Sequence, residues 1–188
     1  MGSNWQDTQR FLFWTHMLSG AAGHTYGAQG IWNMEDGSGE GVGDAGSWGD
    51  FTWREASQFP GSHQLGIGRK FLERYEWYKF ENHPEWAKLE SWDKSERILY
   101  QPYASGIPGE VRVIYIPNFA MVGCNFIKKI RLYDLEENIN YKAHYFNPRT
   151  GMNLKEFEIK YNEYGKCILS IDFSETKRED YVLVLEKG

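Results

Sequence analysis

The sequence lacks the features that define several protein classes. It has 2 cysteines in 188 residues, Cys124 and Cys167, which allow one disulfide at most and exclude a disulfide framework and a cysteine zinc site. No apolar run approaches the roughly 20 residues that a membrane-spanning helix needs. Lysine and arginine number 21 against 26 aspartates and glutamates, so the net charge of −5 argues against nucleic acid as a partner.

Signals for metals, cofactors and export are also missing. The five histidines show no HxH or HxxxH spacing, so we expect no metal site. No GxSxG or P-loop motif occurs, and no GxGxxG follows a strand, so we expect no nucleotide cofactor. The first residues have no basic segment, apolar segment and small-residue cleavage site, which predicts that no signal peptide is present. The sequence does not reveal the compartment.

Tryptophans, glycines and charged residues are unevenly distributed along the chain. Aromatic residues make up 16% of the chain, and all eight tryptophans lie in the first 92 residues with 14 of the 20 glycines. Residues 1–92 carry 7 basic and 12 acidic side chains, a net of −5, whereas residues 93–188 carry 14 of each, a net of zero. We therefore expect two regions of different structure, joined around residues 85–96.

The first region has helical periodicity. Phe11, Trp14 and Leu18 recur at helical spacing, and Gly20 is placed to end that helix. A second helix is expected to start after residues 60–62 and to end near residue 75. Its two glycines, at 66 and 68, lower helix propensity by about 1 kcal/mol each relative to alanine, which suggests close packing there.

Two non-helical segments are expected in the same region. Residues 23–27 resemble a short buried strand that opens into a loop. Residues 37–49 hold six glycines in 13 positions, which predicts a long loop of the kind that is often functional.

The second region alternates between apolar and polar residues, as half-buried strands do. Further strands fit residues 98–103 and 127–133, and residues 147–151 (NPRTG) form a turn signal. Six or seven short strands without a helix predict an antiparallel β-sandwich. The alternating sets are Val111/Val113/Tyr115, Tyr141/Ala143/Tyr145, Phe157/Ile159/Tyr161, Leu169/Ile171/Phe173 and Tyr181/Leu183/Leu185.

Residues 20–32 (GAAGHTYGAQGIW) are the most conspicuous candidate site. Small residues there allow close backbone approach, and His24, Tyr26, Gln29 and Trp32 follow within nine positions. Directional hydrogen-bonding groups beside an aromatic plate are what a sugar site uses. The competing interpretation is that His24 and Tyr26 are hydrogen-bonded core residues and that Trp32 is packing. Both interpretations remain open at this point.

Five carboxylates lie in or beside the glycine-rich loop, and two of them would have to face each other at about 5–10 Å to act as a glycosidase acid and base. Catalytic groups need rigid support, so a solvated or ion-coordinating loop is the better interpretation. Calcium is disfavoured because the regular alternation of a calcium loop is missing. We therefore assign no catalytic residue to Glu35, Asp36, Glu40, Asp44 or Asp50.

Several motifs in order resemble a known family. Residues 10–32, 53–56 (WREA) and 60–65 (PGSHQL) resemble the end of the catalytic domain of apiosidase-like glycoside hydrolases. Residues 145–151 (YFNPRTG) and 180–185 (DYVLVL) resemble the C-terminal β-domain that follows it, a module named for collagen binding.

The resemblance implies a fold for each region. The expected fold is an α+β two-part chain: residues 1–90 as the C-terminal remnant of a (β/α)8 barrel, and residues 93–188 as an accessory antiparallel β-sandwich. Barrel active sites lie at the C-terminal ends of strands, which supports His24, Tyr26, Gln29 and Trp32 as sugar contacts. In such barrels the catalytic carboxylates follow strands four and seven, which would place both upstream of Met1.

Three functions are compatible with these features. The first is the C-terminal portion of a glycoside hydrolase that acts on complex, plant-type glycans and is inactive alone. The alternatives are a stand-alone carbohydrate- or collagen-binding module, and a partner that completes a barrel supplied by another chain. The expected partner is carbohydrate, with no nucleic acid, membrane or cofactor, and parent proteins of this family are expected to be secreted or periplasmic.

Overall fold

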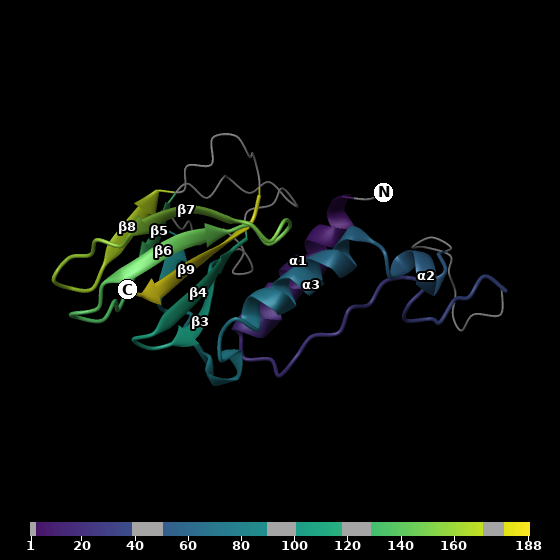
Figure 1. The fold of residues 1–188 in the computed structure, drawn as a ribbon, viewed down its shortest axis with the longest axis horizontal. Helices are drawn as coiled ribbons and strands as arrows, with labels where there is room; N and C mark the ends of the chain where they lie inside the picture. The colour runs from purple at the N-terminus through teal and green to yellow at the C-terminus, as the bar shows by residue number, and fades with distance from the viewer. Residues whose placement is uncertain (1–2, 39–50, 90–100, 118–128, 171–178) are drawn as a thin grey trace.

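The computed structural model describes residues 3–38, 51–89, 101–117, 129–170 and 179–188. The fold is α+β with antiparallel sheets (Figure 1). Its helical elements are α1 (Ser3–Leu18), α2 (Trp53–Ala56), α3 (Pro60–Leu72) and the 3-10 helix η1 (Trp77–Lys79). Its strands are β1 (Glu81–Asn82), β2 (Ala87–Leu89), β3 (Tyr103–Ile107), β4 (Val111–Ile116), β5 (Lys129–Leu132), β6 (Tyr141–Phe146), β7 (Asn153–Glu158), β8 (Cys167–Ser170) and β9 (Tyr181–Lys187).

The two long helices begin and end as their sequences indicate. Gly20 has a φ of +92°, and the N–H groups of Gly20 and Ala21 bond back to the carbonyls of Met17 and His16, which is a Schellman C-cap. The end expected for the first helix is thus confirmed. Pro60 opens α3, where its missing N–H costs nothing, but α3 ends at Leu72, earlier than residue 75.

One expected element is wrong. Residues 23–27 form no strand, although they run extended from α1 toward α2 (Figure 1). A strand needs a hydrogen-bonded neighbour, and this segment lies beside helices instead. Its side chains make specific contacts to α1 and α3 in place of a ladder.

The strands form two sheets. One sheet has six strands in the order β1-β3-β4-β9-β6-β7, and the other has three in the order β2-β5-β8. All pairings are antiparallel, with β9 held between β4 and β6 in continuous register. The turn expected at residues 147–151 joins β6 to β7, with Gly151 at a φ of +77°. Strands β1 and β2 come from residues 81–89, ahead of the composition break.

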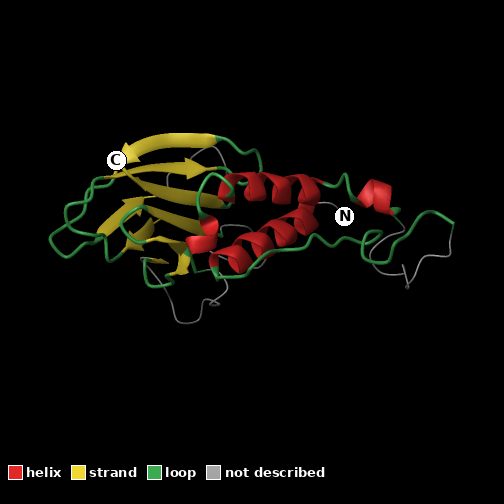
Figure 2. Ribbon diagram, turned by 60° about the horizontal axis from the view of Figure 1, so that its bottom comes forward, coloured by secondary structure: helices red, strands yellow, loops and turns green. Residues whose placement is uncertain are grey.

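The central strands β4 and β9 are buried on both faces, which the alternating pattern alone does not indicate. Ile114, Ile116, Leu183 and Leu185 face the three-stranded sheet and share a core with Ile130 and Leu132. Their neighbours face α1 and α3, where they pack with apolar side chains of both helices (Figure 2). Strands covered on both sides become nearly continuously apolar, and the exception in β4 is Arg112, which is buried with its guanidinium donating to the Tyr133 carbonyl. The helix-facing residues are Val111, Val113, Tyr115, Phe146, Val182 and Val184.

A buried ion pair joins α1 to Asp180, the residue that precedes β9. Arg10 Nε and Nη2 donate to the two carboxylate oxygens of Asp180, each at 2.7 Å, and Arg10 Nη1 donates to Gln64 of α3. The Tyr115 hydroxyl donates to the same carboxylate at 2.8 Å. Burial alone lowers the pKa of Arg10, but Asp180 more than offsets it, so that pKa lies above its ordinary value. The guanidinium is therefore permanently charged, and it fixes the helices on the sheet.

Three further expectations have mixed outcomes. Cys167 is a buried thiol in β8, and burial raises its pKa, whereas Cys124 lies outside the described residues. Close packing explains Gly68, because a Cβ there would lie 2.3 Å from Phe13 Cε1. It does not explain Gly66, where no atom lies within 4 Å. Residues 39–50, most of the glycine-rich loop, also lie outside the described residues.

Candidate functional site

The candidate segment leads from the end of α1 to the end of the molecule that carries α2 (Figure 1). Gln9 Nε2 of α1 donates to the Gly27 carbonyl at 2.7 Å, which ties the extended run to the helix. Beyond it, the chain makes a compact turn over residues 28–35. The arrangement delivers that turn to a place far from the sheets.

The turn at residues 28–35 is tightly built. Gly30 has a φ of +97°, and a Cβ there would lie 2.4 Å from the Phe51 carbonyl oxygen. The Gly30 N–H donates to Asn33 Oδ1 at 2.7 Å, and the Trp53 N–H at the start of α2 donates to the Glu35 carbonyl at 2.7 Å. The backbone of the turn approaches the Phe51 carbonyl most closely at Gly30, where only glycine fits. The turn is therefore held in one conformation.

Trp32 stands out from this support. It is 58% exposed, and its indole Nε1 donates to Gln29 Oε1 at 3.1 Å. Gln29 itself is only 4% exposed, so it anchors the indole from beneath. Among the described residues no acceptor meets Gln29 Nε2. The structure thus brings Gln29 and Trp32 together and leaves the ring open to solvent.

Tyr26 packs where α1, α2 and α3 meet. Its hydroxyl donates to the Ala56 carbonyl at 3.2 Å, and a Cβ on Gly61 would lie 3.5 Å from its ring. Burial raises the pKa of the Tyr26 phenol, so it stays protonated at neutral pH. Its contacts connect the segment to the start of α3.

His24 lies against α1. Its ring is edge-on to Phe13 at a centroid distance of 5.6 Å, and its Nδ1 lies 3.4 Å from Nδ1 of His16. Burial, and then the neighbouring His16, lower the pKa of His24, which favours the neutral ring. These contacts are part of the packing of the segment against α1. His24 precedes the turn that carries Trp32 and does not belong to it.

The carboxylates beside the turn bind their own loop. Glu35 Oε1 accepts from the Gly37 N–H at 2.7 Å, and Asp36 Oδ1 accepts from the Ser38 N–H at 2.8 Å. The bonds to Ser38 hold the pKa of Asp36 below its ordinary value, so it is ionised and is not a general acid at neutral pH. Glu40, Asp44 and Asp50 lie outside the described residues.

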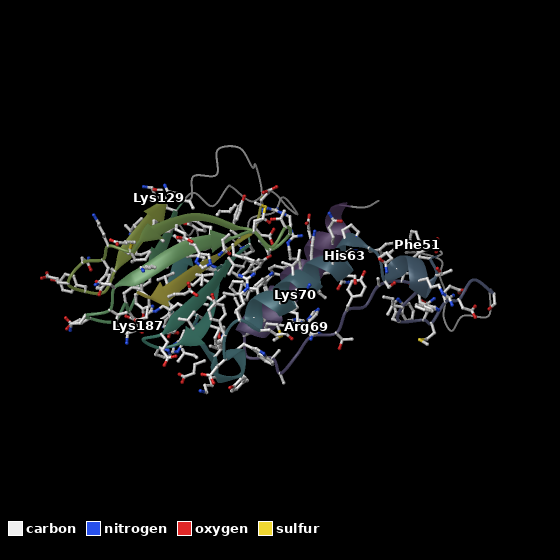
Figure 3. The ribbon with its side chains drawn as sticks, viewed as in Figure 1. Phe51, His63, Arg69, Lys70, Lys129 and Lys187 are labelled. Carbon is white, nitrogen blue, oxygen red and sulfur yellow. The ribbon has the colours of Figure 1, made fainter. Side chains whose placement is uncertain are left out.

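Sequence reasoning missed further aromatic side chains at this end. Trp53 is 42% exposed, with the Arg54 guanidinium 4.5 Å from its ring centroid, and Phe51 and Met34 are also exposed. Figure 3 shows Phe51 at this end of the molecule. The available signal was the presence of tryptophans on both sides of the glycine-rich loop. We call this group of three aromatic side chains and one methionine the aromatic end: Trp32, Met34, Phe51 and Trp53.

Comparison with known proteins identifies the helical region. The sequence model of the family described as "Apiosidase-like, catalytic domain" matches residues 3–79. Residues 3–79 belong to the apiosidase-like family. No curated protein matches the sequence. The candidate segment and all three helices α1, α2 and α3 lie inside the apiosidase-like match, whereas the sheets lie after it.

Two solved structures share the fold of nearly the whole chain. One, named "Glycoside hydrolase", superposes with a TM-score of 0.70 at 15% identity and covers 97% of this chain and 37% of its own. The other is a glycoside hydrolase family 5 protein from Bacteroides vulgatus ATCC 8482, with a TM-score of 0.68 at 16% identity, covering 97% and 36%. The chain therefore spans little more than a third of either structure.

Across the parts of the chain that the structure describes, no three histidine, cysteine or acidic side chains gather as metal ligands. None of the described helices has the length and apolar character to cross a membrane.

Proposed function

We propose that this chain is the C-terminal part of a glycoside hydrolase that acts on complex, plant-type glycans. In this proposal residues 1–90 are the end of a (β/α)8 barrel, and residues 93–188, with the strands just before them, are an accessory β-sandwich. The family match over residues 3–79 and the two glycoside hydrolases of the same fold support it. The β-domain carries no described feature that favours collagen.

The observation that carries the proposal is the exposed, anchored Trp32. An apolar ring held by a buried glutamine loses little entropy when it meets the face of a sugar. In this assignment Trp32 is the platform and Gln29 fixes its indole. Tyr26 and His24 hold the segment that carries them, so all four residues serve one carbohydrate-contacting surface.

We further propose that the chain alone does not hydrolyse glycosides. Retaining and inverting glycosidases need two carboxyl groups about 5–10 Å apart on rigid elements. Glu35 and Asp36 instead bond the backbone of their own loop. The catalytic pair is assigned to the part of the parent protein that precedes these residues.

Binding is tested by titrating neutral oligosaccharides into the wild type and into Trp32→Ala. The variant should lose binding while its melting temperature changes little, because the ring is mostly exposed. Tyr164→Ala is the matched control, since Tyr164 is also an exposed aromatic, 69% accessible, but lies between β7 and β8. Equal binding by the wild type and Trp32→Ala would remove Trp32 from the site.

Hydrolysis is tested separately with a panel of aryl glycosides. The expected result is no turnover above the buffer blank. Turnover that disappears in Glu35→Gln or Asp36→Asn would show that this chain carries its own catalytic carboxylate. That outcome would contradict the assignment of the pair to another part of the protein.

A further inference from the structure

Two histidines that are eight positions apart in the sequence meet at the end of α1. His16 lies in the last turn of α1, and His24 lies in the extended segment that follows. The cap at Gly20 turns the chain back along the helix, and the two Nδ1 atoms lie 3.4 Å apart. An HxH or HxxxH spacing places both ligands on one strand or one helix, so neither spacing reveals a pair that a chain reversal brings together.

The distance between the two Nδ1 atoms matches the distance between two ligands of one tetrahedral metal ion. Two imidazole nitrogens about 2.0–2.1 Å from a zinc ion, at the tetrahedral angle, lie about 3.3–3.4 Å apart. At a right angle on a square-planar copper ion, they would lie only about 2.8 Å apart. Direct hydrogen bonds from N–H groups are mostly about 2.7–3.2 Å long. The separation of 3.4 Å therefore fits two zinc ligands better than a bond between the rings.

Both rings offer Nδ1 to an ion. The His16 side chain is exposed. In His24, Nε2 is buried and has no partner among the described residues, so Nδ1 is the nitrogen that an ion can reach. The Phe13 ring packs edge-on against His24 and holds the imidazole in place. Burial, and then His16, lower the pKa of His24, so its ring is neutral at neutral pH, which is the form that binds metals.

The position of the pair also favours a cation. His16 is the one basic residue in the last turn of α1, a helix of 16 residues. The aligned peptide dipoles of a helix place partial negative charge at its C-terminal end. A doubly charged ion bound at this end is therefore stabilised by the helix as well as by its two ligands.

We propose that His16 and His24 form a zinc site, in which each Nδ1 donates its lone pair to one Zn²⁺ ion. Two imidazoles fill half of a tetrahedral coordination sphere, and water or an anionic ligand takes the other two positions. Within the parts of the chain that the structure describes, no third histidine, cysteine or acidic side chain joins the pair. The site is therefore open, unlike a closed structural site with four protein ligands.

A bound ion would fasten the extended segment to α1 near the start of the segment. The bond from Gln9 to the Gly27 carbonyl already fastens its other end. Because the segment leads to the turn that carries Trp32, zinc would restrict the movement of that turn relative to α1. The site goes beyond the proposed function and does not depend on it, and Trp32→Ala should bind zinc as the wild type does.

Zinc binding is measured by isothermal titration calorimetry on protein without a histidine tag, after treatment with EDTA. The wild type should bind one zinc ion per chain, and excess Mg²⁺ should not compete, because Mg²⁺ prefers oxygen ligands. His16→Gln should bind zinc at least about 10- to 100-fold more weakly, since loss of an outer-shell partner alone costs that much. His16 is exposed, so this variant should keep its melting temperature, and His24→Gln should show the same loss of zinc.

Two other histidines supply matched controls. His63→Gln removes an exposed histidine of α3 (Figure 3) and should bind zinc as the wild type does. His83→Gln removes a histidine whose ring contacts the carboxylates of Glu81 and Glu85, and it should also leave zinc binding unchanged. Together they separate the pair at the end of α1 from zinc binding by any histidine.

Three results would overturn the proposal. The first is zinc binding that is equal in the wild type and His16→Gln, which would place the ion elsewhere on the chain. The second is a wild type that takes up no zinc, which would leave the two rings as a packing contact. The third is zinc that excess Mg²⁺ displaces, which would assign the ion to carboxylates.

Discussion

The two faces of the six-stranded sheet are covered in different ways. Toward β2, β5 and β8 the contact consists of aliphatic and aromatic side chains around one buried cation, Arg112 of β4, which donates to the Tyr133 carbonyl and pairs with the partly exposed Glu136. Toward α1 and α3 it combines stacked aromatic rings, such as Trp14 on Tyr115 at a centroid distance of 6.0 Å, with the buried Arg10–Asp180 pair. Hydrophobic burial does not depend on direction, whereas a bidentate ion pair does. The helices are therefore held in one orientation.

That orientation matters because the helical region reaches beyond the sheet. Its far end carries the turn at residues 28–35 and α2, which have no strand beneath them (Figure 2). The position of the aromatic end relative to the sheets therefore depends on the contacts that hold α1 and α3 against the six-stranded sheet. The contrast between the two faces predicts which substitutions detach the helices and which leave them in place.

The largest effect is expected from Asp180→Asn. Removing this charge leaves the Arg10 guanidinium, 1% exposed, without its main partner, and breaking a buried pair in this way costs about 3–5 kcal/mol. Chemical denaturation would measure the loss in unfolding free energy. Glu73→Gln breaks the exposed pair with Arg69 and should cost less than about 1 kcal/mol.

A double variant sharpens this test. Arg10→Met combined with Asp180→Asn removes both charges, so it should recover part of the stability that Asp180→Asn loses. If the double variant is less stable than the single one, the pair is not the reason for the loss. In that case Arg10 acts mainly through its bonds to Asp7 and Gln64.

Glycines in α3 offer a matched pair of intermediate size. Gly68→Ala should destabilise the protein by about 1–3 kcal/mol, because the Phe13 ring that it meets is itself packed on Trp14 and His24. Gly66→Ala should stabilise it by about 0.4–1 kcal/mol, since the new methyl meets nothing within 4 Å. In thermal melts the two substitutions should shift the melting temperature in opposite directions if α1 and α3 pack as described.

Much of the fold follows from local patterns, and the remainder depends on partners far away in the sequence. Periodicity locates α1, β4 and β9, and Gly20 marks a helix end. Nothing local shows that Val113 and Val184 meet helices, or that Arg10 pairs with a carboxylate 170 positions later. The strand expected at residues 23–27 failed for the same reason, because a strand is defined by its neighbour.

The candidate site was predictable in composition and less so in arrangement. The motif at residues 20–32 indicates hydrogen-bonding groups beside an aromatic plate, and Gln29 and Trp32 are joined in that way. The positions of His24 and Tyr26 depend on α1 and α3, so the motif alone does not fix them. Trp53 joins the surface only because the turn bonds to α2.

Acid should weaken the contact of the extended segment with α1. Burial and His16 hold the pKa of His24 below its ordinary value near 6.5, so the folded state favours the neutral ring. The unfolded chain binds that proton more readily, and this contribution is therefore complete above pH 6.5 and is lost as pH falls below it. Urea denaturation across that pH range should show that His24→Gln loses less unfolding free energy on acidification than the wild type does. An equal loss would assign it to other groups, such as the buried His144.

The smallest effect on stability is expected at Trp32, and it contrasts with Trp14. Trp14 is fully buried between the helices and the sheet, so Trp14→Ala should cost about 3–5 kcal/mol. Trp32→Ala should change the unfolding free energy by about 0.5 kcal/mol or less, because the ring is 58% exposed and water can reach the Gln29 oxygen that it leaves. Denaturation of both variants measures the difference. A loss at Trp32 that approached the loss at Trp14 would make Trp32 a packing residue, and the sugar platform would then have to be Trp53.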